Sequence, residues 1–136
     1  MIGLLILAEK KLGDGLLAAV AHTLGSIPAQ LVAVDLEYDT APEQMDALIR
    51  QALQKVDGGD GALILADVYG ATHTNVACRL LSRGRIELVA GVNLPMLLRV
   101  LNYRQLQMDD LIDKALSGGC GGIVCAGDPS KIREAR

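Results

Sequence analysis

The residues best suited to chemistry lie together in residues 67–75, which read Asp-Val-Tyr-Gly-Ala-Thr-His-Thr-Asn. A carboxylate at the end of an apolar run is followed by glycine and then by hydroxyl side chains where a helix is expected to begin. Backbone N–H groups and hydroxyls in such a corner can hold a phosphoryl group. The residues predicted to bind phosphate are Gly70, Ala71, Thr72 and Asn75. A purely structural alternative is equally open: Thr72 or Thr74 caps the helix and Asp67 binds loop amides.

The two histidines and the acidic residues offer few other sites. His73 could act as a nucleophile or proton carrier, although a loop histidine is more often neither. His22 lies within a helical stretch, where a structural role is favoured. Glu9 follows the first apolar run, and with Asp67 it could hold Mg²⁺, but two carboxylates are a weak signal. Because the sequence has no HxxxH, HxH or Cys/His cluster, we expect no metal site and no cofactor.

The elements that position these residues follow from alternating apolar runs and helix-period stretches. Most of the runs are apolar on both faces, which is typical of strands buried between helix layers. Apolar residues keep helical spacing over residues 12–24, 45–56 and 108–115, and Pro95 is placed early in another helix. The runs expected to be strands are residues 2–8, 31–36, 62–67, 86–92 and 122–126.

This alternation predicts an α/β fold with a three-layer, doubly wound and mainly parallel sheet. With the first and third strands as central neighbours, the order is 2-1-3-4, so Glu9 and Asp67 follow adjacent strands at the same sheet edge. The glycine-rich residues 118–122 are expected to lead into the last strand, which could pair at the edge of its own sheet or with a partner subunit. Residues 1–128 form one predicted domain, and residues 129–136 form a charged tail.

Composition excludes several classes of function. The chain has 136 residues, of which 51% are hydrophobic, with three Tyr and no Phe or Trp, so the core must be aliphatic. A net charge of -3 and the scarcity of rings argue against nucleic-acid binding. The longest apolar stretch, residues 1–8, is far shorter than the roughly 20 residues that span a bilayer, and no basic segment precedes it. Three Cys without a CxxC pair fit a reducing cytoplasm.

Three stretches carry a resemblance to a known family over residues 1–125. They are residues 1–7, residues 65–72 with 75–77, and most specifically residues 89–98, Val-Ala-Gly-Val-Asn-Leu-Pro-Met-Leu-Leu. The chain resembles the enzyme IIA component of the mannose/fructose class of the bacterial phosphoenolpyruvate-dependent sugar phosphotransferase system. The resemblance implies a cytoplasmic homodimer whose mainly parallel sheet is completed by a C-terminal antiparallel strand, exchanged between subunits.

The resemblance also implies a reaction. Members of this family accept a phosphoryl group from the carrier HPr on a histidine directly after the first strand and pass it to a IIB component. Asp67 and Thr72 match the family's supporting Asp and phosphate-holding hydroxyl. The acceptor position, however, is occupied here by Glu9, and the family's proline after Gly-Gly-Thr is His73. A carboxylate is a weaker nucleophile than imidazole, and beside Asp67 it adds repulsion against an anionic phosphoryl group.

Three functions therefore stay open. The first is a regulatory or transfer-defective IIA protein, in which Glu9 imitates part of the charge of a phosphorylated histidine. The second is a working phosphocarrier that uses His73 as its acceptor. The third, less favoured, is a receiver-like domain phosphorylated on Asp67. It is disfavoured because residues 125–127 read Cys-Ala-Gly where a receiver has a lysine at the end of its last strand.

Overall fold

Four short aliphatic strands form one parallel sheet in the computed structural model, which describes residues 1–128. The strand order is β2-β1-β3-β4, as predicted from the sequence. Both central strands are buried along their whole length, because helices cover the sheet on both faces. The strands are β1 (Gly3–Leu7), β2 (Leu31–Ala33), β3 (Ala62–Ala66) and β4 (Ile86–Ala90).

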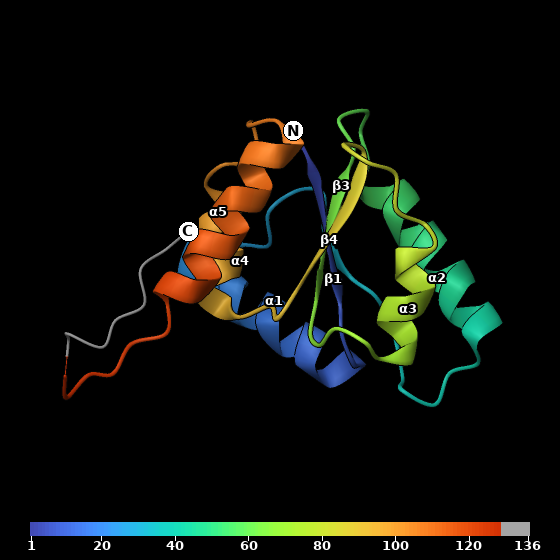
Figure 1. The fold of residues 1–136 in the computed structure, drawn as a ribbon, viewed down its shortest axis with the longest axis horizontal. Helices are drawn as coiled ribbons and strands as arrows, with labels where there is room; N and C mark the ends of the chain where they lie inside the picture. Colours follow the sequence, from blue (N-terminus) through green and yellow to red (C-terminus); the bar gives the residue numbers. More distant parts are fainter. Residues whose placement is uncertain (129–136) are drawn as a thin grey trace.

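The described part of the chain has five helices, which form two outer layers on the sheet (Figure 1). One face of the sheet is covered by α2 and α3, and the other by α1, α4 and α5. Successive side chains of β1 point to opposite faces of the sheet, so the strand contributes to both layers. Leu4 and Ile6 belong to one apolar cluster, and Leu5 and Leu7 belong to the other. The helices are α1 (Lys10–Leu24), α2 (Pro42–Val56), α3 (Thr72–Cys78), α4 (Leu94–Leu101) and α5 (Met108–Gly121).

The end of the described chain differs from the prediction. A strand was expected over residues 122–126, but α5 continues to Gly121, and the residues from 123 to 128 form no strand. Two glycines of residues 118–122, which were expected to lead into that strand, lie within α5 and pack against α4. A Cβ at Gly118 would lie 2.8 Å from the Arg99 side chain, and one at Gly119 would lie 2.8 Å from Met96. These glycines therefore allow α5 to approach α4 closely.

The segment after α5 lies at the far end of that helix, away from the sheet (Figure 1). Ile123 and Val124 are 62% and 52% exposed. Within residues 1–128 the sheet consists of β2, β1, β3 and β4 alone, so residues 122–126 pair with no strand there and β4 is an edge strand. The predicted charged tail, residues 129–136, lies outside the described residues. In the part of the chain that is described, no helix is long and apolar enough to cross a membrane.

Candidate functional site

Glu9 joins the carboxyl end of β1 to the start of α1. It is the N-cap residue of that helix, and both of its carboxylate oxygens accept a hydrogen bond from the main-chain N–H of Lys11, at 3.0 and 3.1 Å. An N-cap carboxylate satisfies an unpaired N–H and stabilises the positive end of the helix dipole. The side chain expected at the reacting position is thus engaged by its own helix.

Asp67 follows β3 and is the centre of a hydrogen-bonded cluster. Its main-chain N–H donates to the carbonyl of Leu7, at 3.2 Å, which fixes it beside the end of β1. Its side chain is only 6% exposed. Oδ1 accepts from the Val68 N–H at 2.7 Å and lies 2.6 Å from Nε2 of His73, while Oδ2 accepts from the Tyr38 hydroxyl. Asp67 therefore does bind a loop amide, as the structural alternative expected, and it also binds the side chains of Tyr38 and His73.

His73 and Tyr38 come from different segments and stack on each other. His73 is the second residue of α3, and its side chain is 3% exposed. Tyr38 lies in the connection between β2 and α2, and the two ring centroids are 5.3 Å apart, with 21° between the ring planes. Sequence reasoning singled out His73 but missed Tyr38. Applying the strand-end argument to β2, as it was applied to β1 and β3, would have drawn attention to it.

Charge within the cluster follows from these contacts. Burial alone would raise the pKa of Asp67, but hydrogen bonds from Tyr38, His73 and the Val68 N–H outweigh it and hold that pKa below its usual value. The hydrogen bond to Asp67 and the loss of solvent raise the pKa of Tyr38 to about 12, against a smaller lowering by the Glu9 main chain. At neutral pH, Asp67 is therefore an anion and Tyr38 a neutral donor.

The residues predicted to bind phosphate lie at the start of α3. Gly70 has a φ of +88°, a left-handed conformation that favours glycine, and Thr72 and Asn75 are exposed. Ala71 is the N-cap residue, and its methyl group cannot accept a hydrogen bond, so the expectation that a threonine caps this helix is wrong. The Thr74 hydroxyl instead donates to the Ala71 carbonyl at 2.9 Å.

The structure brings only some of the predicted site residues into contact. Asp67 and His73 pair directly, whereas the Glu9 carboxylate is bound within residues 1–128 by Lys11 rather than by either of them. The same described residues contain no group of three His, Cys, Asp or Glu side chains that could hold a metal ion. The arrangement can orient an imidazole and hold a negative charge, and it does so beside an exposed loop.

Comparison with known proteins gives concordant matches. The profile of the EIIA-man family, described as "PTS system fructose IIA component", matches residues 3–116. The fructose-specific EIIA component of Bacillus subtilis (strain 168) is 34% identical over 91 residues, 64% of this chain and 62% of that protein. The mannose-specific EIIAB component of Escherichia coli (strain K12) is 35% identical over 74 residues, 52% of this chain and 23% of that protein. The matches thus span less than two thirds of either relative.

Solved structures share the fold. EIIA from Streptococcus agalactiae superposes with a TM-score of 0.82 at 24% identity, covering 93% of this chain and 98% of the other. The mannose/sorbose-specific IIA subunit from Enterococcus faecalis gives 0.80 at 20% identity, covering 94% and 96%. At these identities the likeness concerns the fold, and the profile match over most of the chain carries the assignment. This chain belongs to the EIIA-man family of sugar phosphotransferase system components.

Proposed function

We propose that this chain is a cytoplasmic IIA-type component that carries no phosphoryl group on the residue after β1 and has a regulatory role. The observation that carries the proposal is that the Glu9 carboxylate is hydrogen-bonded to its own helix. Glu9 stands where the family resemblance places the acceptor histidine, and its carboxylate is taken up in capping α1. Both oxygens accept a hydrogen bond from the Lys11 N–H, which holds the carboxylate against the first turn of α1 and makes a weak nucleophile weaker still.

Electrostatics supports the same conclusion. Asp67 is an anion at neutral pH, and a second carboxylate nearby repels the phosphoryl group of a donor. The fixed charge of Glu9 has the sign of a phosphorylated histidine, although a phosphoryl group carries more charge and a different shape. A partner could recognise the phosphorylated form of a IIA protein by its negative charge. The Glu9 carboxylate would present part of that charge to such a partner without any phosphorylation.

The partners proposed are those of the family, namely HPr and a IIB component. We also propose that the chain forms a homodimer in which residues 123–126 pair with the sheet of the second subunit. The exposed Ile123 and Val124 support this, since two aliphatic side chains in sequence gain stability when covered. Gly70, Ala71, Thr72 and Asn75 are the groups proposed to face a phosphoryl group presented by a partner.

A second function, a phosphocarrier that uses His73, is favoured by one contact. Nε2 of His73 lies 2.6 Å from Asp67 Oδ1, and a carboxylate in that position fixes the orientation and the tautomer of an imidazole. Burial of the ring opposes this function, because a side chain that is 3% exposed offers a donor little access. Asp67 itself is a weaker candidate acceptor, since both of its oxygens already accept hydrogen bonds.

Intact-mass measurement separates these functions. The chain is incubated at neutral pH with phosphoenolpyruvate, enzyme I and HPr, and an active IIA protein is labelled in parallel as the positive control. The proposal predicts no mass gain in the chain. A gain that His73→Ala abolishes would replace the proposal by the His73 carrier, and Mg²⁺-dependent labelling by acetyl phosphate that Asp67→Asn abolishes would indicate a receiver-like protein.

A further inference from the structure

We propose that Tyr38 is a positioning residue that holds Asp67 and closes the solvent side of His73, so that the imidazole reacts only when Tyr38 moves away. The inference rests on the proposed function and deepens it, because it gives a physical reason why His73 does not replace the missing acceptor. Three segments meet in this arrangement: the β2–α2 connection, the end of β3 and the first turn of α3.

The first argument concerns Asp67. Its carboxylate is 6% exposed and bridges two side chains, with Oδ1 toward His73 and Oδ2 toward the Tyr38 hydroxyl. A buried carboxylate that loses one of its donors must rotate or admit water, because an unpaired charged oxygen is unfavourable away from solvent. Removal of the Tyr38 hydroxyl therefore loosens the contact between Asp67 and His73 without touching either residue.

The second argument concerns access. The His73 side chain is 3% exposed, whereas Tyr38, stacked on it, is 55% exposed. Solvent thus reaches the outer side of the tyrosine while the ring beneath it is covered. Tyr38 is the layer between solvent and one face of the imidazole.

The third argument is that Tyr38 can move at little cost to the core. Two hydrogen bonds fix its backbone: the Leu36 carbonyl accepts from the Lys10 N–H at 2.7 Å, and the Glu37 carbonyl accepts from the Thr40 N–H at 3.1 Å, which closes a turn around Tyr38. Leu36 is fully buried, but Tyr38 and Asp39 are exposed. A side-chain rotation at Tyr38 opens the cluster while Leu36 stays in place.

The contact to Asp67 also selects the nitrogen that would react. An ionised carboxylate only accepts hydrogen bonds, so Nε2 of His73 must carry the proton that it shares with Oδ1. In the neutral ring the lone pair is then on Nδ1, which is the nucleophilic atom. Opening of Tyr38 exposes an imidazole that is already held in one tautomer.

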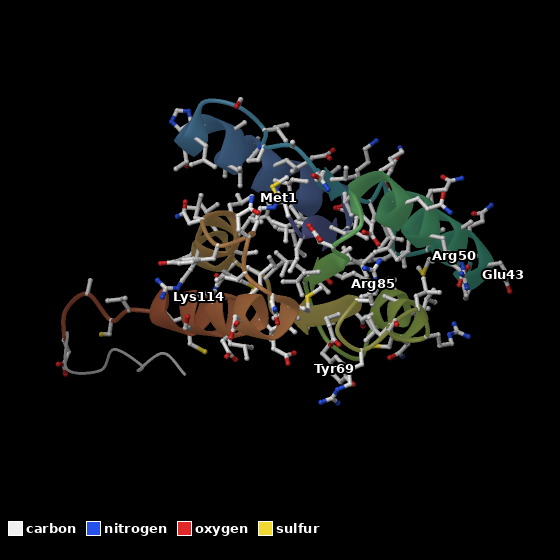
Figure 2. All side chains as sticks on the ribbon, turned by 90° about the horizontal axis from the view of Figure 1, so that it is seen from above. Met1, Glu43, Arg50, Tyr69, Arg85 and Lys114 are labelled. Atoms are coloured by element: carbon white, nitrogen blue, oxygen red, sulfur yellow. The ribbon has the colours of Figure 1, made fainter. Side chains whose placement is uncertain are left out.

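Chemical modification of the two histidines tests this proposal within one molecule. His22 is exposed on α1 and serves as an internal reference, and diethyl pyrocarbonate acylates accessible neutral imidazoles. Rates at each histidine are measured by peptide mapping in the wild type, Tyr38→Phe and Tyr38→Ala. The matched control is Tyr69→Ala, because Tyr69 is 77% exposed at the molecular surface (Figure 2).

We expect His22 to react rapidly in every variant and His73 to react slowly in the wild type. Tyr38→Ala should raise the His73 rate about tenfold, as expected when a hydrogen bond to a charged group and its covering ring are both lost. Tyr38→Phe should give an intermediate rate, because the ring stays and the hydroxyl is lost. Tyr69→Ala should leave the ratio of the two rates unchanged.

Two results would overturn the proposal: a wild-type His73 that reacts as fast as His22, or a His73 rate that is the same in Tyr38→Ala. If Tyr38→Ala unfolds, long-range ¹H–¹⁵N spectra of Tyr38→Phe decide the matter, since the proposal requires a change in the His73 ring signals. No phosphotransferase protein is present in these experiments. A chain that HPr phosphorylates would therefore overturn the proposed function while leaving this reactivity ratio as an independent result.

Discussion

The two ends of the sheet each bury a charged side chain, and they do so in different ways. At the amino ends of β1 and β2, Arg104 is 5% exposed and donates to the carbonyls of Ile2, Ala29 and Gln30 at 3.0, 2.6 and 2.7 Å. At the carboxyl ends, Asp67 is bound by one amide and by the side chains of Tyr38 and His73.

The difference lies in what holds each charge. All three partners of Arg104 are main-chain groups of segments fixed by the sheet, so this cluster can rearrange only if the fold opens. Two partners of Asp67 are side chains, which change rotamer without disturbing the backbone. The Arg104 cluster at the amino end therefore stabilises the fold. At the carboxyl end, a local side-chain rearrangement can change the contacts of Asp67 and the exposure of His73. The following predictions test that contrast, beginning with the largest effect.

Arg104→Met keeps much of the side-chain volume and leaves three carbonyls without their donor. We expect the free energy of unfolding to fall by about 3 to 5 kcal/mol, because several buried acceptors lose a charged partner at once. Urea denaturation measures the change, and Arg83→Met, at an exposed position, is the control. A loss within experimental error of the control would remove the contrast between the two ends.

Asp67→Asn should lower the free energy of unfolding by about 2 kcal/mol near neutral pH, since the His73 and Tyr38 contacts lose their charge. The pKa of Asp67 is held below its usual 3.8 in the folded chain, so its contribution is present above that value and is lost as the pH falls further. Denaturation at a series of acid pH values should show the difference between wild type and variant shrinking. A difference that grows on acidification would contradict the assigned charge state.

Glu9→Ala tests the helix-capping role that the structure gives to Glu9. Removing the carboxylate should cost about 1 kcal/mol, the usual effect of losing an N-cap acceptor. Glu9→Asp, which keeps an N-cap acceptor, should recover most of the loss in the same urea experiment. Equal stability of all three chains would show that the cap contributes little and that Glu9 is free for another role.

The titration of Tyr38 gives the smallest and most local test. The hydrogen bond to Asp67 raises its pKa to about 12, so the stabilising contact is complete below pH 10 and is lost as the pH rises toward 12. Tyrosinate absorbance should show a late step near that pH, and Tyr38→Phe should abolish it. Persistence of the late step in Tyr38→Phe would assign it to another tyrosine and weaken the description of the cluster.

Much of this arrangement follows from strand-end reasoning. Alternating apolar runs predicted the strand order, and the rule that parallel strands end at one edge predicted that residues after β1 and β3 are neighbours. Tyr38 was missed because the strand-end rule was applied only after the first and third runs, although Tyr38 follows the predicted second run by two residues. Its contacts with Asp67 and His73 depend on how the following connection folds back, which no local pattern encodes.

The packing role of the α5 glycines was not predicted from the sequence either. A glycine-rich run reads as a turn when only its conformational freedom is considered. Gly118 and Gly119 instead provide space for Arg99 and Met96, a requirement that arises only when α4 and α5 pack together. Helix–helix proximity is a property of the folded chain, and the apolar period of residues 108–115 ends before these positions.

The central claim is that position 9 decides whether this IIA-family chain carries a phosphoryl group, and Glu9→His tests it most directly. Wild type and variant are incubated side by side with phosphoenolpyruvate, enzyme I and HPr, and their intact masses are compared at neutral pH. We predict that the wild type gains no mass, that Glu9→His gains one phosphoryl group, and that Glu9→Ala, like the wild type, gains none. Phosphorylation of the wild type, or a Glu9→His chain that folds and stays unlabelled, would contradict the account.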